Sequence, residues 1–138
     1  MKIIANAKLL DNMAFECGVD GHKFTIDADE KVGGKNRGPS PKPLMLTSLA
    51  GCTAMDVISI LRKMRVELDD FDVVVEGNDT TEHPKHYDKM KIIYKFWGKD
   101  LPMDKLKKAV SLSEDRYCGV SFVYKKAIEI TSEIIINE

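Results

Sequence analysis

The sequence predicts a single α+β domain, and three features of the chain predict it. Three short runs with strand-like composition come first, one long apolar segment follows, and strand-like and helical segments then alternate to the end. Strands and helices grouped in this way are typical of α+β folds. The chain has 138 residues, of which 43% are hydrophobic. Residues 1–138 are therefore enough for one domain with a real core.

Composition excludes several classes of partner. Lys and Arg number 21 against 22 Asp and Glu, which leaves no charge excess to attract nucleic acid or an anionic membrane. Polar residues follow Met1 too soon for a signal peptide, and no run reaches the roughly 18 uninterrupted apolar residues of a membrane span. We therefore expect a cytoplasmic protein. Cytosolic thiols are kept reduced, so three cysteines should be buried, metal-binding or redox-active.

The N-terminal third reads as three strands and a loop. Lys2–Leu9, Met13–Cys17 and Lys23–Asp27 are separated by Asp-Asn and Asp-Gly dipeptides, which predicts an antiparallel meander. Glu30–Pro43 contains three glycines and three prolines, which break regular structure, so this segment is expected to be a loop.

A long helix is predicted to follow Pro43, a residue that fits the first turn because its missing N–H costs nothing there. The helix runs for about 22 residues at 1.5 Å each and ends among Arg62, Lys63 and Arg65, cations that suit a helix C-terminus. Its apolar residues cover most of the circumference, so we expect it to be buried nearly all round. A chain of this size cannot wrap such a helix alone, which predicts that a second copy covers part of it.

Two strands, a helix and a last strand complete the chain. Phe71–Asn78 and Met90–Trp97 are rich in β-branched and aromatic residues, and an exposed loop should join them. An amphipathic helix is expected from Pro102 to Tyr117, and a final strand over Ile128–Ile136.

Cys52 lies in the middle of the long apolar helix, where it is either a small core residue or a redox centre. Gly51 costs about 1 kcal/mol relative to Ala in a helix interior, which suggests that something approaches the backbone closely. Asp56 is a carboxylate on an otherwise apolar helix, so it should have a partner. Cys52 lies too far from the helix start for the macrodipole to activate it, so a reactive thiolate needs a cation from elsewhere.

The other cysteines and the histidines give weaker signals. Cys118 follows Arg116 and precedes a glycine, in a position that we expect to be more accessible and suited to a resolving thiol, although a packed cysteine is equally compatible. Cys17 is expected to be structural. His83 and His86 read as a solvated loop, and no Cys-x-x-Cys or His-Glu-x-x-His pattern occurs. We predict no metal and no cofactor.

Two motifs together resemble those of the OsmC/Ohr superfamily (osmotically inducible protein C and organic hydroperoxide resistance protein). One is a Gly-Pro-Ser-Pro loop that leads into the cysteine helix, and the other is an Arg-Tyr-Cys segment. In this sequence they read Gly38-Pro39-Ser40-Pro41 with Ala50-Gly51-Cys52-Thr53-Ala54-Met55-Asp56, and Arg116-Tyr117-Cys118 with Val120-Ser121. The resemblance covers essentially the whole chain. It is nearest to short OsmC-like proteins with a Gly-Gly loop before the helix.

The resemblance implies an OsmC-like fold, with curved antiparallel sheets around long central helices, in an intertwined homodimer with active sites at the subunit interface. It also implies thiol-dependent reduction of organic hydroperoxides in oxidative-stress defence. Carried onto this sequence, Cys52 is the peroxidatic thiol, which becomes a sulfenic acid, and Cys118 is the resolving thiol, which forms a disulfide with it. An external dithiol then resets the pair.

One departure from the family pattern concerns the activation of the Cys52 thiol. The family's reductases have a glutamate at the start of the cysteine helix that orients an arginine over the sulfur, whereas this region reads Pro41-Lys42-Pro43-Leu44. Arg37 is the only arginine upstream of the helix, so it is our candidate for the cation that stabilises the thiolate, with Lys31 and Lys35 as others. The alternative is an OsmC-fold dimeric binding protein with weak or no peroxidase activity.

Overall fold

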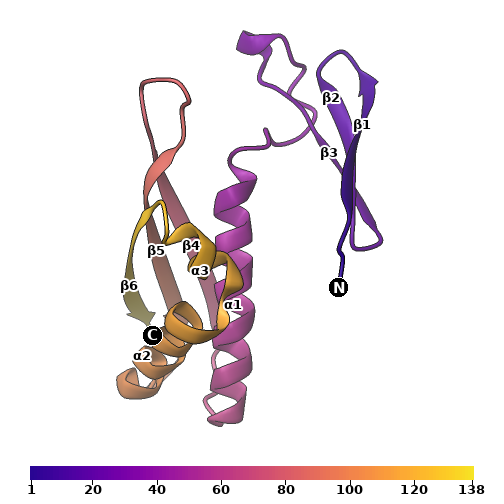
Figure 1. The fold of residues 1–138 in the computed structure, drawn as a ribbon. Coiled ribbons are helices and arrows are strands. Elements are labelled where there is room, and N and C mark those ends of the chain that lie inside the picture. Colours follow the sequence, from indigo (N-terminus) through magenta and orange to yellow (C-terminus); the bar gives the residue numbers. More distant parts are fainter. The chain divides into compact units, whose positions relative to one another are not determined.

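The computed structural model describes residues 1–138, which form two compact units, Met1–Met45 and Leu46–Glu138. Each unit contains one three-stranded sheet (Figure 1). The predicted α+β class is confirmed. The single domain expected over residues 1–138 stays a prediction.

The first unit contains the predicted antiparallel meander. Its strands are β1 (Ala5–Asp11), β2 (Ala14–Val19) and β3 (His22–Ile26), in the order β1-β2-β3. Asn12, Asp20 and Gly21 have φ of 51°, 52° and 76° in the two turns. Asn, Asp and Gly are the residues that adopt this left-handed conformation most readily, which explains why the dipeptides marked the turns. A short 3₁₀ turn, η1 (Glu30–Val32), interrupts the expected loop.

The second unit has a mixed sheet formed by β4 (Asp70–Asp79), β5 (Tyr87–Trp97) and β6 (Glu129–Asn137), in the order β4-β5-β6. Strands β4 and β5 are antiparallel, with Val73 opposite Tyr94, but β6 runs parallel to β5, with Ile134 beside Tyr94. The expectation of purely antiparallel sheets is therefore wrong for this pair. A parallel pair needs a long crossover, and the helical segment between β5 and β6 provides it.

That crossover consists of three helical pieces rather than the single helix predicted from Pro102 to Tyr117. They are α2 (Met103–Leu112), a π-helical turn η2 (Ser113–Tyr117) and α3 (Gly119–Tyr124). In η2 the N–H of Cys118 donates to the carbonyl of Ser113, five residues earlier, at 2.8 Å. The π turn and α3 change the chain direction around Cys118, and this change places its side chain.

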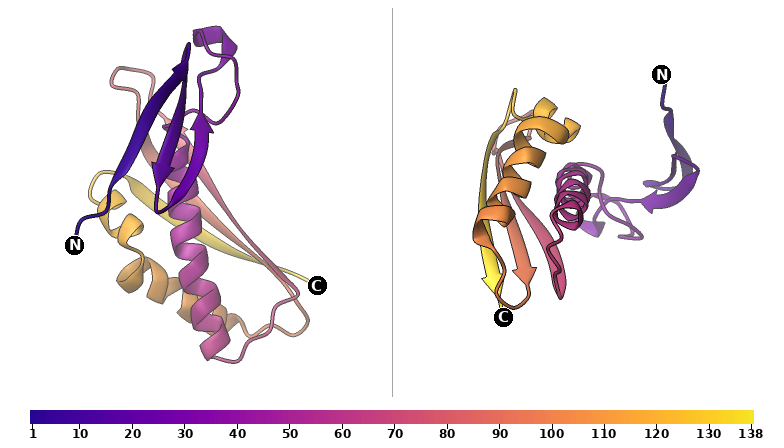
Figure 2. Two further views of the ribbon diagram at one scale, coloured as in Figure 1. Left: turned by 90° about the vertical axis from the view of Figure 1, so that its right-hand side faces the viewer. Right: turned by 90° about the horizontal axis from the view of Figure 1, so that it is seen from below.

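The long helix α1 (Leu44–Lys63) lies with α2 and α3 on one face of the β4-β5-β6 sheet (Figure 2). On β5 every second residue from Met90 to Phe96 is buried against these helices. On α1 only Leu49, Thr53, Val57 and Leu61 are buried, one residue per turn. Within one chain α1 therefore has a single buried stripe, and the expectation that a second copy covers part of the helix stays a prediction.

Helix α1 is long and apolar enough to cross a membrane, judged by length and composition alone. Core helices of soluble proteins meet the same criteria. Here the buried stripe of α1 includes a polar residue, Thr53, whose hydroxyl is hydrogen-bonded to Tyr94 and Ser113 within the same unit. Those contacts are typical of a helix that packs on a protein domain.

Candidate active site

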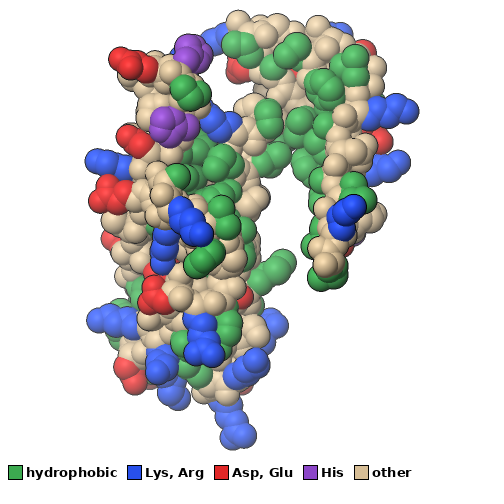
Figure 3. Space-filling model, in the orientation of Figure 1, with side chains coloured by type: hydrophobic (Ala, Val, Ile, Leu, Met, Phe, Trp, Pro, Cys, Tyr) green, Lys and Arg blue, Asp and Glu red, His purple; other side chains and the backbone are tan.

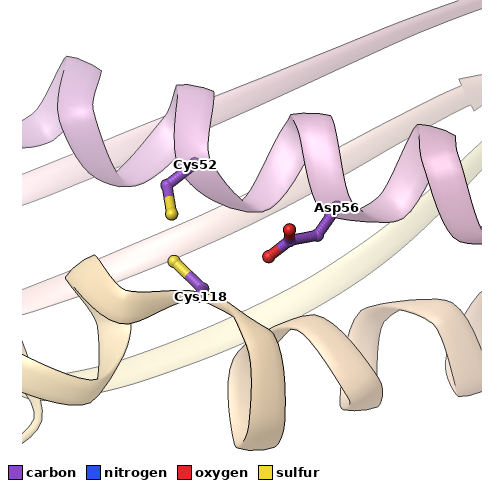
Figure 4. Close-up of side chains that lie close together, drawn as sticks. All are labelled: Cys52, Asp56 and Cys118. Carbon is purple, nitrogen blue, oxygen red and sulfur yellow. The ribbon is translucent and has the colours of Figure 1, made fainter.

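Cys52 and Cys118 lie together in the second unit. Cys52 projects from the middle of α1, and Cys118 lies at the junction of η2 and α3. Their Sγ atoms and a carboxylate oxygen of Asp56 all lie within 4.8 Å of one another. Figure 4 shows the two thiols pointing toward each other, with Asp56 beside them, one turn further along α1. A disulfide bond is about 2.05 Å long, so the sulfur atoms need to approach by less than about 3 Å.

Cys118 is buried, with 3% of its surface exposed, so the expectation that it is the more accessible thiol is wrong. It is the N-cap of α3, and its Sγ accepts a hydrogen bond from the N–H of Ser121 at 3.3 Å. Burial and then the neighbouring Cys52 thiol raise the pKa of Cys118 to about 11. At neutral pH Cys118 is therefore a protonated thiol.

Asp56 has the partner that the sequence predicted. The hydroxyl of Ser113 in η2 donates to its Oδ2 at 2.9 Å. This contact ties α1 to η2 beside the two thiols and fixes the direction of the carboxylate.

A network of hydroxyl groups lies behind the thiols, and the sequence did not predict it. The Thr53 hydroxyl lies 2.8 Å from the hydroxyls of both Tyr94 on β5 and Ser113. The Tyr94 hydroxyl in turn donates to Glu114 Oε1 at 3.1 Å. Burial raises the pKa of Tyr94 well above its usual range, so this hydroxyl stays protonated. Thr53 is one turn after Leu49 on the buried stripe. A polar residue at that spacing indicates a buried hydrogen bond, and the sequence could have predicted it on that basis.

Two surface hollows adjoin the cluster. Asp56 lines one of about 440 Å³, together with Ile60, Lys63 and Leu112. Cys118 and Glu114 line another of about 450 Å³. Tyr117 lines both, so aromatic and aliphatic surface lies next to the thiols and the carboxylates.

The cluster offers three donor atoms, two thiol sulfurs and one carboxylate oxygen, where a structural zinc site takes four. The histidines weighed in the sequence, His83 and His86, are exposed in the β4–β5 loop and are not part of this cluster.

Gly51 has no crowded neighbour within the chain. A Cβ built on it meets no atom within 4 Å other than those of its own helix. The close approach to the backbone that we expected at Gly51 is therefore not made by any residue of the second unit.

Arg37, the candidate thiolate-stabilising cation, belongs to the first unit and is bound there by two carboxylates. Its Nη2 lies 2.7 Å from Asp11 Oδ1, and its Nε lies 3.2 Å from Oδ2 of Asp27, which is 2% exposed. Hydrogen bonds and the opposite charges of these carboxylates raise the pKa of Arg37 beyond its usual range. Its role toward Cys52 stays a prediction, as does the structural role of Cys17, which is half-buried in β2.

Comparisons with known proteins identify the family and the fold. A model of the OsmC-like protein family matches residues 33–133. The chain is 32% identical over 111 residues to "Protein YhfA" of Escherichia coli strain K12, and the match covers 80% of each chain. The structure resembles that of a hypothetical protein from Aquifex aeolicus VF5, with a TM-score of 0.83, 28% identity and coverage of 100% and 99% of the two chains. It also shares its fold with the organic hydroperoxide resistance protein OhrB of Bacillus subtilis, with a TM-score of 0.68, 15% identity and coverage of 97% and 98%.

The fold and the paired thiols thus define an OsmC-type protein. The chain belongs to the OsmC-like protein family, as the resemblance of its two cysteine motifs predicted.

Proposed function

We propose that this protein reduces organic hydroperoxides by a two-cysteine mechanism, with Cys52 as the peroxidatic thiol and Cys118 as the resolving thiol. The observation that carries the proposal is the convergence of the two Sγ atoms within 4.8 Å. Family membership supports it, since relatives that share the fold include organic hydroperoxide resistance proteins.

The exposure of the two thiols favours this order of events. Cys52 is half-buried, so a hydroperoxide can reach it, whereas Cys118 is covered. The Cys52 sulfur attacks the O–O bond and becomes a sulfenic acid, and the thiol proton leaves with the alcohol product. Cys118 then displaces the sulfenic oxygen as water and forms the disulfide. A dithiol reductant takes the two oxidising equivalents away and restores both thiols.

The proposal places the protein in the cytoplasm as a homodimer with the active sites at the subunit interface. The homodimer is supported by the apolar surface that each unit leaves exposed. Leu9 and Leu10 on β1 are 56% and 49% exposed, and Met55 on α1 is 74% exposed. Figure 3 shows hydrophobic side chains at the surface of both units. Arg37 is retained as the candidate cation for the Cys52 thiolate.

A second candidate function is a dimeric binding protein with weak or no peroxidase activity. The observation that favours it is the start of α1, where Pro41-Lys42-Pro43 supplies no carboxylate to orient an arginine. Arg37 is moreover held by Asp11 and Asp27.

Titration with cumene hydroperoxide separates the two candidates. We expect wild-type protein to lose two thiols per hydroperoxide consumed and to release one alcohol. C118S should stop at a sulfenic acid that dimedone traps, C52S should not react, and C17S should behave as wild type. Hydrogen peroxide should react more slowly than the organic substrate. A C52S protein that consumes the hydroperoxide at the wild-type rate would overturn the proposal.

A further inference from the structure

Three hydroxyl groups connect two carboxyl groups through the interior of the second unit. In order, the chain of contacts runs from Asp56 to Ser113, Thr53, Tyr94 and Glu114, over 2.9, 2.8, 2.8 and 3.1 Å. The three hydroxyl-bearing residues in the middle are each fully buried. The two ends lie in different surface hollows, with Asp56 beside the thiols and Glu114 in the other hollow.

The contacts outnumber the hydrogens that can fill them. Three hydroxyls supply three hydrogens, whereas the chain has four oxygen–oxygen contacts at hydrogen-bond distance. If both carboxyls are ionised, the hydroxyls of Ser113 and Tyr94 donate outward, and Thr53 can donate to only one of them. The other 2.8 Å contact then places lone pairs of two hydroxyl oxygens against each other, within residues that have no surface exposed to solvent.

One further hydrogen removes this conflict, and we propose that Asp56 and Glu114 share it as a single proton. With the proton on Asp56, every hydroxyl donates in the direction of Glu114. With the proton on Glu114, every hydroxyl donates in the direction of Asp56. A concerted shift of hydrogens along the chain interconverts the two arrangements and moves one positive charge between the two ends.

The surroundings of both ends are compatible with one negative charge on the pair. Asp56 faces Cys52 on its own helix and Cys118 and Ser113 across from it, and Lys63 and Tyr117 line its hollow. Glu114 also accepts from Ser132 on β6 at 3.4 Å, and its hollow is lined by Asp115, Arg116, Lys125 and Lys126. No ion pair fixes either carboxyl in the charged form.

The shared proton gives Asp56 two roles at the thiol pair, and this half of the inference rests on the proposed function. With the proton at Glu114, Asp56 is a carboxylate that can accept the proton of Cys52 as the sulfur attacks. It then returns that proton to the alkoxide released from the O–O bond. The same exchange serves Cys118, whose thiol must lose a proton before it attacks the sulfenic acid, while the departing oxygen gains one as water. Glu114 acts from a distance as a positioning residue.

Infrared spectroscopy tests the shared proton without reference to activity. We expect the reduced wild-type protein at neutral pH to show the carbonyl stretch of one neutral carboxylic acid. D56N and E114Q should each abolish it, because the new amide N–H supplies the fourth hydrogen and leaves the other carboxyl ionised. D115N, which changes an exposed carboxylate next to Glu114, is the matched control and should keep the band.

Two results would overturn the shared proton: no neutral carboxyl band in the wild-type protein, or a band that survives in both D56N and E114Q.

The rate of Cys52 oxidation by cumene hydroperoxide tests the catalytic role of Asp56. D56N should slow it by about 100-fold or more, the usual contribution of a general acid–base group. E114Q should change the rate far less, because Asp56 remains a carboxylate. An unchanged rate in D56N would refute the role of Asp56, whereas a wild-type protein that does not react refutes the proposed function and leaves the infrared result valid.

Discussion

Cys118 shows how the setting of one residue determines its chemistry. Burial of its side chain and the neighbouring Cys52 thiol raise its pKa to about 11, although the hydrogen bond from the N–H of Ser121 at the start of α3 acts in the opposite direction. A neutral thiol does not attack at an appreciable rate, which supports the proposed order in which Cys118 reacts only after Cys52 has been oxidised.

The raised pKa predicts a specific loss of stability in alkali. The ordinary pKa of a cysteine thiol is about 9, so below this pH the Cys118 thiol is protonated in both the folded and the unfolded chain. As pH rises toward about 11, only the unfolded thiol ionises, so the unfolded state binds fewer protons and the stability contributed by the neutral thiol falls. Urea unfolding of wild type and C118S at several pH values measures this. The wild type should lose stability relative to C118S across that window, and a constant difference would contradict the assignment.

Thr53 joins α1 to β5 and to η2 through one buried hydroxyl. Thr53→Val keeps the shape of the side chain but removes its hydroxyl. The hydroxyls of Tyr94 and Ser113 then lose a hydrogen-bond partner. We expect a loss of roughly 1–3 kcal/mol in the free energy of unfolding, measured with urea. The matched control is Thr47→Val on the exposed side of the same helix, which should stay within about 0.5 kcal/mol of wild type. Equal effects of the two substitutions would show that the buried contacts contribute nothing.

At the scale of elements, the π turn and α3 assemble the site. Ser113 and Glu114 belong to η2, and Cys118 follows it and caps α3. The sequence predicted the helix starting after Pro102 but not this break, because no residue before Gly119 disrupts the helical pattern. The π turn coincides with the contacts of Ser113 and Glu114 with α1 and β5, which no local pattern reveals.

The cap at Cys118 leads to a prediction for α3. Cys118→Ser retains an acceptor for the N–H of Ser121, whereas Cys118→Ala does not. We expect C118A to be less stable than C118S by about 1 kcal/mol in thermal or urea unfolding, the usual contribution of an N-cap side chain. If the alanine variant is the more stable of the two, the sulfur is not an effective cap.

The two sheets show which parts of the fold can be predicted from the sequence. The turns at Asn12 and Asp20 have local signatures, so β1–β3 and their antiparallel pairing were predicted correctly. The direction of β6 has no local signature, because alternation of side chains is the same in parallel and antiparallel strands. For the candidate site, motif and polarity in the sequence pointed to Cys52, Cys118 and Asp56, whereas the contact of Tyr94 with Glu114 is seen only in the tertiary structure.

At the scale of the whole molecule, the exposed apolar surface is the main unexplained feature of a single chain. The buried stripe of α1 occupies one side, and Met55 on another side is 74% exposed. Apolar surface of this kind on a helix and on a sheet supports the proposed homodimer.

Self-association can be tested at this surface. Met55→Lys should raise the dimer dissociation constant at least tenfold in sedimentation equilibrium, because a charge would be buried in the proposed interface. Met103→Lys on α2 is the matched control, since the same substitution at a residue that is 38% exposed should leave association unchanged. A monomeric wild-type protein, or a dimer insensitive to Met55→Lys, would refute the proposed interface.

The central claim is that Cys52 and Cys118 form one redox pair, and peptide mapping of the oxidised protein tests it most directly. After one equivalent of cumene hydroperoxide and alkylation of the remaining thiols, we predict a Cys52–Cys118 disulfide as the main product, with Cys17 alkylated. Cys52 and Cys118 both recovered in alkylated form, or a disulfide that includes Cys17, would contradict the account.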